Sequence, residues 1–396
     1  MVSLAPPHQR AHPVQSGASR PIRIGLLGTY PPTQCGLASF AAALRDSLLA
    51  HASPAEVGVV RMVEEADSPA RSEVSFGLRT DRPQDVDAAA AHLDRFDVAI
   101  VQHEYGIFGG RDGDQVLKVL DRLTVPVIAV LHTVLSAPTP HQKRVMEQVV
   151  AAADTVVTLS VTGRLRLCAG YHVDPRKVVV IPHGAWPGGR PEPVGARPSR
   201  PIVLTWGLLG PGKGVEWGVA ALARLQVMDP RPLYVVAGQT HPRVLARDGE
   251  QYRDSLRRQA TAAGVADMLQ FRPGYLDAAT LRTLVADADV VLLPYDSHEQ
   301  VTSGVLIEAV ASLTPVVSTA FPHARELLAD GAGALVPHAD PEAIAIALRR
   351  VLAEPAHAVA MVASAARIAP TLRWPAIADQ YLRVVDSTLS RHVQAA

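Results

Sequence analysis

The chain has 396 residues, which is enough for two domains of ordinary size. Its 38 Lys and Arg residues balance 38 Asp and Glu residues, so we expect no nucleic acid among its partners, because such binding depends on clustered cations. With 48% hydrophobic and 19% charged residues, the composition is that of a folded protein rather than of a disordered chain. The two cysteines, Cys35 and Cys168, cannot build a disulfide framework and fit a reducing cytoplasm.

Residues 1–20 contain three prolines and no apolar run of the length that a signal sequence needs, so we expect a flexible tail there. No apolar stretch elsewhere approaches the ~20 residues of a membrane-spanning helix. We therefore expect a cytoplasmic protein. Peripheral contact with a membrane surface and the oligomeric state are left open.

Short apolar runs alternate with helical patterns in both halves of the chain. In the first half the expected strands are 23–28, 57–62, 97–103, 126–132, 155–160 and 178–183. In the second half they are 201–207, 232–239, 268–274, 289–295, 315–319 and 334–338. Most of these runs are apolar at every position, which is typical of strands buried on both faces of a parallel sheet. The pattern predicts an α/β protein with two Rossmann-like domains.

The segment 187–200 separates the two halves and contains four prolines and three glycines without periodicity, so we interpret it as a linker. The predicted domains are 21–186 and 201–370, facing each other across a cleft. A helix within 371–396 is expected to cross back to the first domain. Open parallel sheets bind ligands beyond the carboxyl ends of their strands, so functional residues are sought directly after strands.

The first such motif is GLLGPGKG at 207–214, between an expected strand and an expected helix. A glycine such as Gly212 lets the backbone approach a ligand, and Lys213 offers a point charge suited to phosphate. The alternative interpretation is a glycine turn with a solvated lysine. The motif also nearly matches the phosphate loop of nucleoside triphosphatases, but Gly214 stands where Ser or Thr would hold Mg²⁺, so triphosphate hydrolysis is the weaker alternative.

A second motif runs from His298 to Thr319. Ser303, Gly304 and Val305 begin a helix, so their amides can face a diphosphate. Glu308 lies about one turn further and can accept hydrogen bonds from two neighbouring hydroxyls, as on a ribose. The alternative is that Glu308 only complements the helix dipole. Combined with Lys213, the pattern favours a nucleotide-diphosphate site.

These motifs resemble those of the retaining glycosyltransferases of the GT-B fold, specifically glycosyltransferase family 4, also called group 1. The similar segments are the GPGKG loop, residues 271–295, and the run from Ser303 through PHAREL at 322–327. The resemblance covers nearly the whole chain from residue 22 onward. It implies transfer of a hexose, mannose or glucose, from a nucleotide-diphospho-sugar to an acceptor hydroxyl, with retention of configuration and without a metal or other cofactor.

The resemblance also implies roles for residues of the second domain. Lys213 would contact the donor diphosphate and Glu308 the nucleotide ribose. The residue eight positions before Glu308 would contact the transferred sugar, and here it is Gln300 instead of the usual glutamate. A basic residue is usual five positions before the lysine, where this chain has Leu208. The loop containing Arg272, Gly274 and Tyr275 would flank the base.

The first domain is expected to supply the other wall of the cleft. Gly36 begins a helix whose N-terminus would point toward the donor, and the resemblance implies that His132 hydrogen-bonds the donor sugar. The predicted catalytic set is therefore His132, Lys213, Gln300 and Glu308. In the loop 102–114, His103, Tyr105 and Arg111 are candidates for acceptor contact, although a purely structural loop is an equal alternative.

We expect no metal site and no nucleophilic cysteine. His103 and Glu104 lack the second histidine of a helical zinc site, and no base is paired in sequence with Cys35. Two other functions stay open within the same fold. One is a non-catalytic protein that binds sugar nucleotides, and the other is a phosphorylase or an epimerase.

Overall fold

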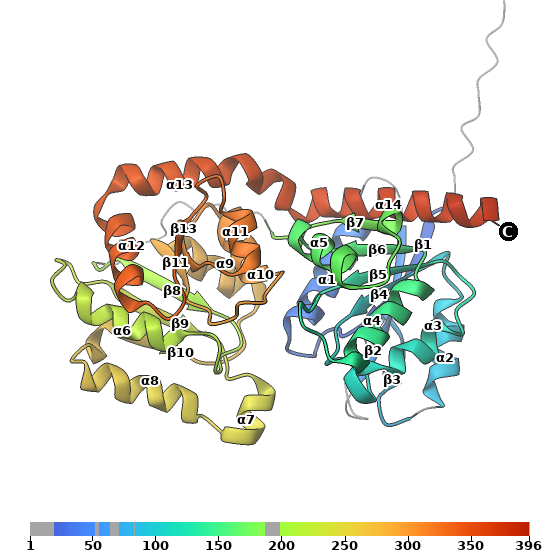
Figure 1. Ribbon diagram of the computed structural model, residues 1–396, viewed down its shortest axis with the longest axis horizontal. Coiled ribbons are helices and arrows are strands. Elements are labelled where there is room, and N and C mark those ends of the chain that lie inside the picture. Colours follow the sequence, from blue (N-terminus) through green and yellow to red (C-terminus); the bar gives the residue numbers. More distant parts are fainter. Residues whose placement is uncertain (1–19, 52–54, 64–70, 83, 187–198, 396) are drawn as a thin grey trace, which may run out of the picture.

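The computed structural model describes residues 20–51, 55–63, 71–82, 84–186 and 199–395. All but Arg20 of the expected tail, and residues 187–198 of the expected linker, lie outside the described residues. Within the described ranges the chain forms two parallel sheets, one in each half, with helices on both faces (Figure 1). The predicted α/β architecture is confirmed.

The described residues of the first half form a seven-stranded sheet in the order β3-β2-β1-β4-β5-β6-β7. Its strands are β1 (Ile22–Gly28), β2 (Ala55–Val63), β3 (Val74–Arg79), β4 (Val98–His103), β5 (Val127–Leu131), β6 (Thr155–Thr158) and β7 (Val178–Val180). Its helices are α1 (Gly36–Leu49), α2 (Asp85–Leu93), α3 (Gln115–Leu120), α4 (Pro140–Ala152) and α5 (Val161–Gly170), with short 3₁₀ turns η1 (Arg111–Gly113) and η2 (Pro175–Lys177).

The described residues of the second half form a six-stranded sheet in the order β10-β9-β8-β11-β12-β13. Its strands are β8 (Ile202–Trp206), β9 (Leu233–Ala237), β10 (Leu269–Arg272), β11 (Val290–Leu293), β12 (Val316–Thr319) and β13 (Ala334–Val336). The helices are α6 (Val215–Leu225), α7 (Pro242–Asp248), α8 (Gln251–Ala262), α9 (Ala278–Asp287), α10 (Gly304–Ala311), α11 (Pro322–Leu327), α12 (Pro341–Ala353), α13 (Pro355–Ile368) and α14 (Trp374–Ala395), with 3₁₀ turns η3 (Ala266–Met268) and η4 (Ala369–Leu372).

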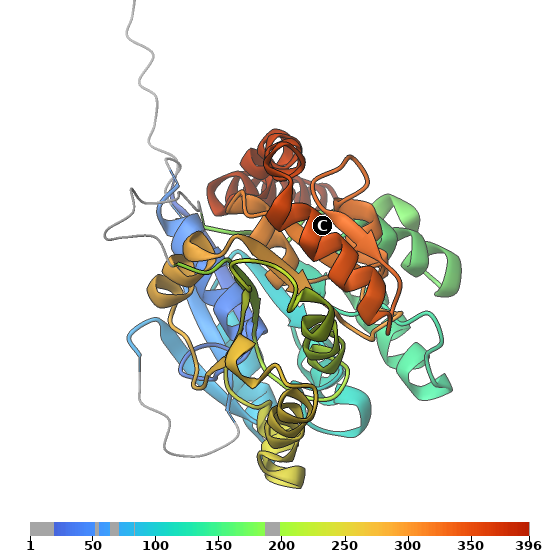
Figure 2. The same ribbon diagram turned by 90° about the vertical axis from the view of Figure 1, so that its left-hand side faces the viewer.

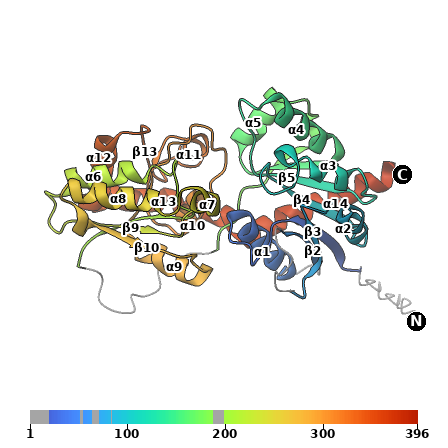
Figure 3. The ribbon, with the colours of Figure 1, turned by 90° about the horizontal axis from the view of Figure 1, so that it is seen from below.

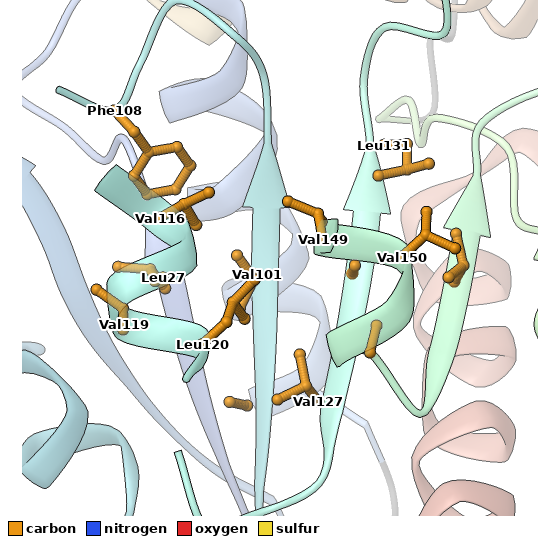
Figure 4. Packing of buried hydrophobic residues seen from close by; sticks show 14 of the residues in the cluster. Leu27, Val101, Phe108, Val116, Val119, Leu120, Val127, Leu131, Val149 and Val150 are labelled. Atoms are coloured by element: carbon orange, nitrogen blue, oxygen red, sulfur yellow. The ribbon is translucent and has the colours of Figure 1, made fainter. Parts of the chain in front are cut away.

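The central strands are apolar along their whole length because both of their faces are covered. Along β4, Val98 and Ile100 belong to the core under α1 and α14, whereas Ala99 and Val101 belong to the core under α3 and α4. This is the two-residue alternation of a strand. Figure 4 shows the second of these layers, with Val101 of β4 among the buried side chains of the neighbouring elements.

The edge strand β3 (Val74–Arg79) was not expected from the sequence. It pairs with β2 alone and most of its residues are only half-buried, so its sequence VSFGLR lacks the continuous apolar run of the central strands. Several of the observed strands also end earlier than expected. The run 289–295, for example, leaves the sheet at Leu293, and the following residues enter the loop toward α10.

Helix α14 crosses from the second domain to the first. Trp374 begins the helix and packs edge-on against Phe40 of α1, with the two ring centres 5.2 Å apart. Ile377, Tyr381 and Val385 then belong to the same buried cluster as β1 and β4. Figures 1 and 2 show α13 and α14 along one edge of the molecule, with α8 on the opposite side.

Within the described ranges, no single helix combines the length and the apolar character needed to cross a bilayer. The helical segments 341–353 and 355–372 have the required length and apolar character only when they are taken together. The pair is bent by 94°.

Both sheets reverse their strand order next to their first strand, since β1 lies between β2 and β4, and β8 lies between β9 and β11. The loops that follow β1 and β4, and those that follow β8 and β11, therefore diverge at the carboxyl edge of each sheet. Such a switch point is where open α/β sheets bind ligands.

Candidate functional site

The carboxyl edges of the two sheets face each other, and hydrogen bonds cross between them. Ser39 of α1 and Tyr275 after β10 share a hydrogen bond of 2.8 Å between their hydroxyls. Gly36 opens the same helix as Ser39, and a side chain added there would meet nothing within 4 Å. Gly36 and Tyr275, predicted from distant parts of the sequence, are thereby brought to the same contact between the two domains.

The glycine loop between β8 and α6 has a backbone that requires glycine. Gly212 and Gly214 have φ values of 90° and 62°. A Cβ on Gly214 would lie 1.8 Å from the Pro294 carbonyl oxygen, so Ser or Thr does not fit there. A Cβ on Gly212 would meet nothing within 4 Å, and the Gly212 carbonyl accepts a hydrogen bond of 3.0 Å from the Asp296 amide. The loop is thus anchored to the end of β11 and open at its tip.

Lys213 is held by an aromatic ring rather than by a carboxylate. Its Nζ lies 4.3 Å from the centre of the Tyr295 ring, a cation–π arrangement. Among the described residues it makes no ion pair. The ring therefore positions the ammonium group while its N–H donors stay available to an anion.

The tip of α10 offers two free amides rather than three. The Ser303 hydroxyl caps the helix by accepting from the Leu306 amide at 3.2 Å. The Ser303 amide, which the sequence predicts to face a diphosphate, instead donates to Nδ1 of His323 at 2.9 Å. Gly304 and Val305 are the first two helical residues, and their amides have no intrahelical acceptor.

A histidine of the first domain reaches this tip. A Cβ on Gly304 would lie 2.9 Å from Nε2 of His183, so only glycine fits. His183 shares a hydrogen bond of 2.6 Å with the Gly184 carbonyl through Nδ1. Burial lowers the pKa of His183 to about 4, so the ring is neutral and Nδ1 carries the proton. Nε2, on the side of Gly304, is then an acceptor.

Glu308 lies one turn into α10 and is half-buried. Burial raises the pKa of Glu308 to about 7, although a hydrogen bond from the Trp206 side chain acts in the opposite direction. Trp206 is the last residue of β8 and is 4% exposed. The carboxylate therefore lies close to the end of β8, where the glycine loop begins.

Gln300 and its neighbour Glu299 have separate partners. The Gln300 amide nitrogen donates to the Thr302 carbonyl at 2.9 Å, which leaves its Oε1 as an acceptor. Glu299 instead forms an ion pair of 3.1 Å with Arg166 of the first domain and also accepts a hydrogen bond from Ser136. Glu299 therefore joins the two domains and does not replace the absent glutamate at position 300.

His132 is a neutral imidazole on the first domain's wall. Burial, followed by the neighbouring His183 and His103, lowers the pKa of His132 to about 3. Its Nε2 donates to Oε1 of Gln102 at 2.5 Å, which leaves Nδ1 as an acceptor. Phe40 of α1 packs edge-on against both His132 and His183, with each pair of ring centres 5.0 Å apart.

The structure does not turn the predicted acceptor residues toward one exposed site, although the rings of His103 and Tyr105 pack edge-on with their centres 5.2 Å apart. His103 is fully buried, because the alternation along β4 turns it to the same face as Ala99 and Val101, so it cannot contact an acceptor. Tyr105 is half-buried against the same core, and its hydroxyl donates to the Gln142 carbonyl at 3.4 Å. Arg111 is 73% exposed in the 3₁₀ turn η1.

Glu104, which was considered only as a metal ligand, is a half-buried carboxylate of this loop. It accepts hydrogen bonds from the Tyr105 amide and the Thr133 hydroxyl. Burial raises the pKa of Glu104, while these two bonds and the charge of Arg243 from the second domain oppose that rise. The signal in the sequence that could have identified Glu104 as a site residue was its position directly after β4, next to the acceptor candidates.

Arg272 and Gly274 lie in the exposed segment that leads to Tyr275. Arg272 ends β10 with its side chain exposed, and Gly274 has a φ of 108° with open space around it. Leu208 is half-buried in the glycine loop. The Cys35 sulfur caps α1 by accepting from the Ala38 amide at 3.4 Å, which is a structural role. Within the described ranges no group of three or more His, Cys, Asp or Glu side chains could hold a metal ion.

Comparisons with known proteins agree with this architecture. Residues 191–368 match the family model "Glycosyl transferases group 1", and residues 47–185 match "Glycosyltransferase Family 4". A D-inositol 3-phosphate glycosyltransferase from Kineococcus radiotolerans is 33% identical over 297 residues, which is 67% of this chain and 66% of that protein. The protein of the same name from Actinosynnema mirum is 30% identical over 297 residues, 69% of this chain and 68% of that protein.

The chain thus spans about two thirds of the length of the relatives that it matches. For some relatives the share is slightly smaller, for example 63% of the length of the protein from Geodermatophilus obscurus. Among solved structures, Anabaena HepE in complex with UDP and glucose has a TM-score of 0.72 at 18% identity, over 92% of this chain and 100% of that one. Sucrose-phosphate synthase from Thermosynechococcus elongatus has a TM-score of 0.70 at 19% identity, over 94% and 99%. At these identities the structures establish a common fold, GT-B.

Proposed function

Because the chain belongs to the group 1 family of glycosyl transferases, we propose that it transfers a hexosyl group, glucose or mannose, from a nucleotide-diphospho-sugar to an acceptor hydroxyl. One observation carries the proposal. The Lys213 loop and the α10 tip, with Glu308 one turn further, follow the neighbouring strands β8 and β11. The bond from the Asp296 amide to the Gly212 carbonyl anchors the Lys213 loop to the end of β11, and Trp206 at the end of β8 hydrogen-bonds Glu308 of α10. A cation, free amides and a carboxylate acceptor together match a diphosphate followed by a ribose.

The proposed role of Lys213 and the α10 tip is to stabilise the leaving group. When the bond from the anomeric carbon to the diphosphate oxygen breaks, negative charge grows on that oxygen. The Lys213 ammonium and the Gly304 and Val305 amides are fixed before the reaction, so they stabilise this charge without reorganising. They supply the positive charge that a divalent ion would otherwise supply, and we infer that no metal cofactor is needed.

The proposed sugar contacts are neutral. Oε1 of Gln300 and Nδ1 of His132 are both free to accept hydrogen bonds from sugar hydroxyls, and Glu308 would accept from the ribose. Neither Gln300 nor His132 carries a charge near neutral pH, so they orient the sugar rather than attack it.

The proposed transfer occurs on one face of the sugar, with retention. The acceptor oxygen bonds to the anomeric carbon on the side from which the diphosphate leaves, and the acceptor proton passes to the departing phosphate oxygen. None of the predicted site residues is a carboxylate placed as a nucleophile, which supports a route without a glycosyl-enzyme intermediate. We place this reaction in the cytoplasm, as the low cysteine content suggests.

The test is to incubate the purified protein with radiolabelled UDP-glucose, GDP-mannose and ADP-glucose, with and without polyol and inositol phosphate acceptors. HepE, a structural neighbour, was solved with UDP and glucose, which makes UDP-glucose the first donor to try. Donor-dependent transfer with an α-linked product from an α-linked donor supports the proposal. Tight donor binding without turnover would favour a non-catalytic protein, and cleavage that depends on free phosphate would favour a phosphorylase.

A further inference from the structure

The first turn of α7 is packed against the loop that carries Lys213. The Leu209 amide donates to the Gln239 carbonyl and the His241 amide donates to the Leu209 carbonyl, each at 2.8 Å. A Cβ on Gly210 would lie 3.1 Å from Cγ2 of Val244. The residues from 239 to 244 therefore form a second wall beside the glycine loop, and Figures 1 and 3 show α7 on the side of the second domain that faces the first.

Arg243 reaches from this wall to the first domain. Its Nη2 donates to the Gly106 carbonyl of the first domain at 2.8 Å. A Cβ on Gly106 would lie 3.3 Å from the same nitrogen, so glycine leaves room for the guanidinium. The side chain is otherwise exposed, and among the described residues it forms no ion pair.

Two cations that form no ion pair among the described residues therefore act on one side chain, His241, beside the glycine loop. Burial lowers the pKa of His241, and the positive charges of Arg243 and Lys213 lower it further, so both charges act on this imidazole. The His241 ring accepts a hydrogen bond from the Arg243 amide through Nδ1 at 3.2 Å, which fits its neutral form. Glu104 of the first domain is close enough for the Arg243 charge to act on its pKa, but within the described ranges neither cation has a carboxylate at ion-pair distance. Like charges repel, so an anion that binds between the two cations stabilises both.

We propose that Arg243 is the second cation of the diphosphate site and binds the donor's diphosphate together with Lys213. The inference rests on the proposed function, whose donor brings two negative charges to this wall. A guanidinium suits phosphate because it can donate two parallel hydrogen bonds. Leu208, in the glycine loop itself, cannot supply this positive charge. Arg243 supplies it from α7, which follows the next strand, β9.

Binding the diphosphate through Arg243 also connects the two domains. The same guanidinium holds the Gly106 carbonyl, which lies two residues after Glu104 in the loop 102–114, where acceptor contacts were predicted from the sequence. A bound diphosphate would therefore fix the acceptor loop through Arg243. The rival interpretations are that Arg243 only tethers the domains, or that it binds an anionic acceptor.

Three variants separate these interpretations. Arg243→Gln keeps an NH₂ donor for the Gly106 carbonyl but removes the charge, whereas Arg243→Lys keeps a charge. Arg247→Gln is the matched control, since Arg247 lies one turn further on the same helix and pairs with Asp248 at 2.6 Å. Calorimetry would measure the affinity for UDP, GDP and ADP, and for the matching nucleosides, at two salt concentrations.

We expect Arg243→Gln to weaken binding of the accepted nucleoside diphosphate about tenfold or more and to reduce its salt dependence, with the nucleoside affinity unchanged. Arg243→Lys should retain most of the affinity and Arg247→Gln all of it. Unchanged diphosphate affinity in Arg243→Gln, equal losses for nucleotide and nucleoside, or an effect confined to the acceptor KM would each overturn the inference. If the wild-type protein binds none of the three diphosphates, the proposed function itself fails.

Discussion

Glu326 of α11 accepts a hydrogen bond of 2.8 Å from the backbone amide of Thr162, so a carboxylate of the second domain caps helix α5 of the first. The same carboxylate accepts from the Val161 amide and the Thr162 hydroxyl at 2.8 and 2.7 Å. On the same short helix, His323 holds the Ser303 amide at the start of α10. Helix α11 thus connects the contact between the domains to the proposed diphosphate site.

Replacing Glu326 should therefore affect both stability and donor binding. Glu326→Ala removes a helix cap, and we expect a loss of about 1–2 kcal/mol in the free energy of unfolding. Ser160→Ala is the matched control, because Ser160 caps the same helix from within the first domain at 2.9 Å. Both variants should lower stability, but only Glu326→Ala should weaken sugar-nucleotide binding. Equal donor affinity in the two variants would contradict the connection through α11.

Lys213 should contribute to diphosphate binding through its charge. Its ammonium is positioned by the Tyr295 ring and has no carboxylate partner among the described residues, so Lys213→Met leaves no unpaired acid behind. We expect nucleoside-diphosphate affinity to fall by about 1–3 kcal/mol, with nucleoside affinity unchanged. Lys118→Met, an exposed lysine on α3, is the control. Calorimetry with UDP and uridine measures both, and an unchanged UDP affinity would refute the assignment.

Gln300 should act on the sugar and not on the nucleotide. Gln300→Ala removes the free Oε1 acceptor but leaves Lys213 and the α10 amides in place. We expect the transfer rate to fall by about tenfold, which corresponds to one hydrogen bond made in the transition state, while UDP affinity is retained. Steady-state kinetics and calorimetry separate the two effects. A parallel loss of UDP affinity would place Gln300 at the diphosphate instead.

Donor binding should depend on pH through Glu308. Its raised pKa, about 7, means that the carboxylate form needed to accept ribose hydroxyls increases between pH 6 and pH 8. The esterified diphosphate of UDP-glucose stays ionised over this range, so it makes a clean probe. Affinity should rise with pH in the wild-type protein and be weak and flat in Glu308→Gln. A flat wild-type profile would show that ionisation of Glu308 does not control binding.

The sequence was sufficient for those parts of the fold and of the candidate site that are local in the chain. Central strands were recognised because burial on both faces demands apolar residues at every position, whereas the edge strand β3 has no such demand. Lys213 and Glu308 could be proposed because each belongs to a contiguous segment: Lys213 lies in the loop between β8 and α6, and Glu308 lies one turn into the helix that follows β11.

Residues whose importance depends on another element were missed or misplaced. His183 is notable only because its Nε2 approaches Gly304 of the other domain, and His323 only because it takes the Ser303 amide. Neither contact follows from spacing along the chain. His103 was placed at the acceptor because it ends a strand, but the alternation that begins at Ala99 turns it into the core.

The buried histidines should make the protein sensitive to mild acid. Burial is the largest cause of the lowered pKa of His103, His132, His183 and His323, to about 4, about 3, about 4 and about 4. In the unfolded chain their pKa is about 6.5. Below that value the unfolded state binds protons that the folded state does not, so the free energy of unfolding falls as the pH drops from 6.5 toward 4. Glu308, with its raised pKa of about 7, binds a proton in the folded state and offsets one of these four contributions.

His103 gives this effect its sharpest test, because its ring is fully buried and neither ring nitrogen has a hydrogen-bond partner within the described structure. His103→Phe keeps an aromatic ring beside Tyr105 and should not lower stability at pH 7. The slope of the free energy of unfolding against pH should become smaller by the equivalent of one proton, which is about 1.4 kcal/mol per pH unit between pH 6 and pH 4.5. Urea unfolding followed by tryptophan fluorescence at several pH values measures the slope, with the exposed His392→Gln as control. An unaltered slope in His103→Phe would mean that His103 is protonated in the folded protein, against its burial.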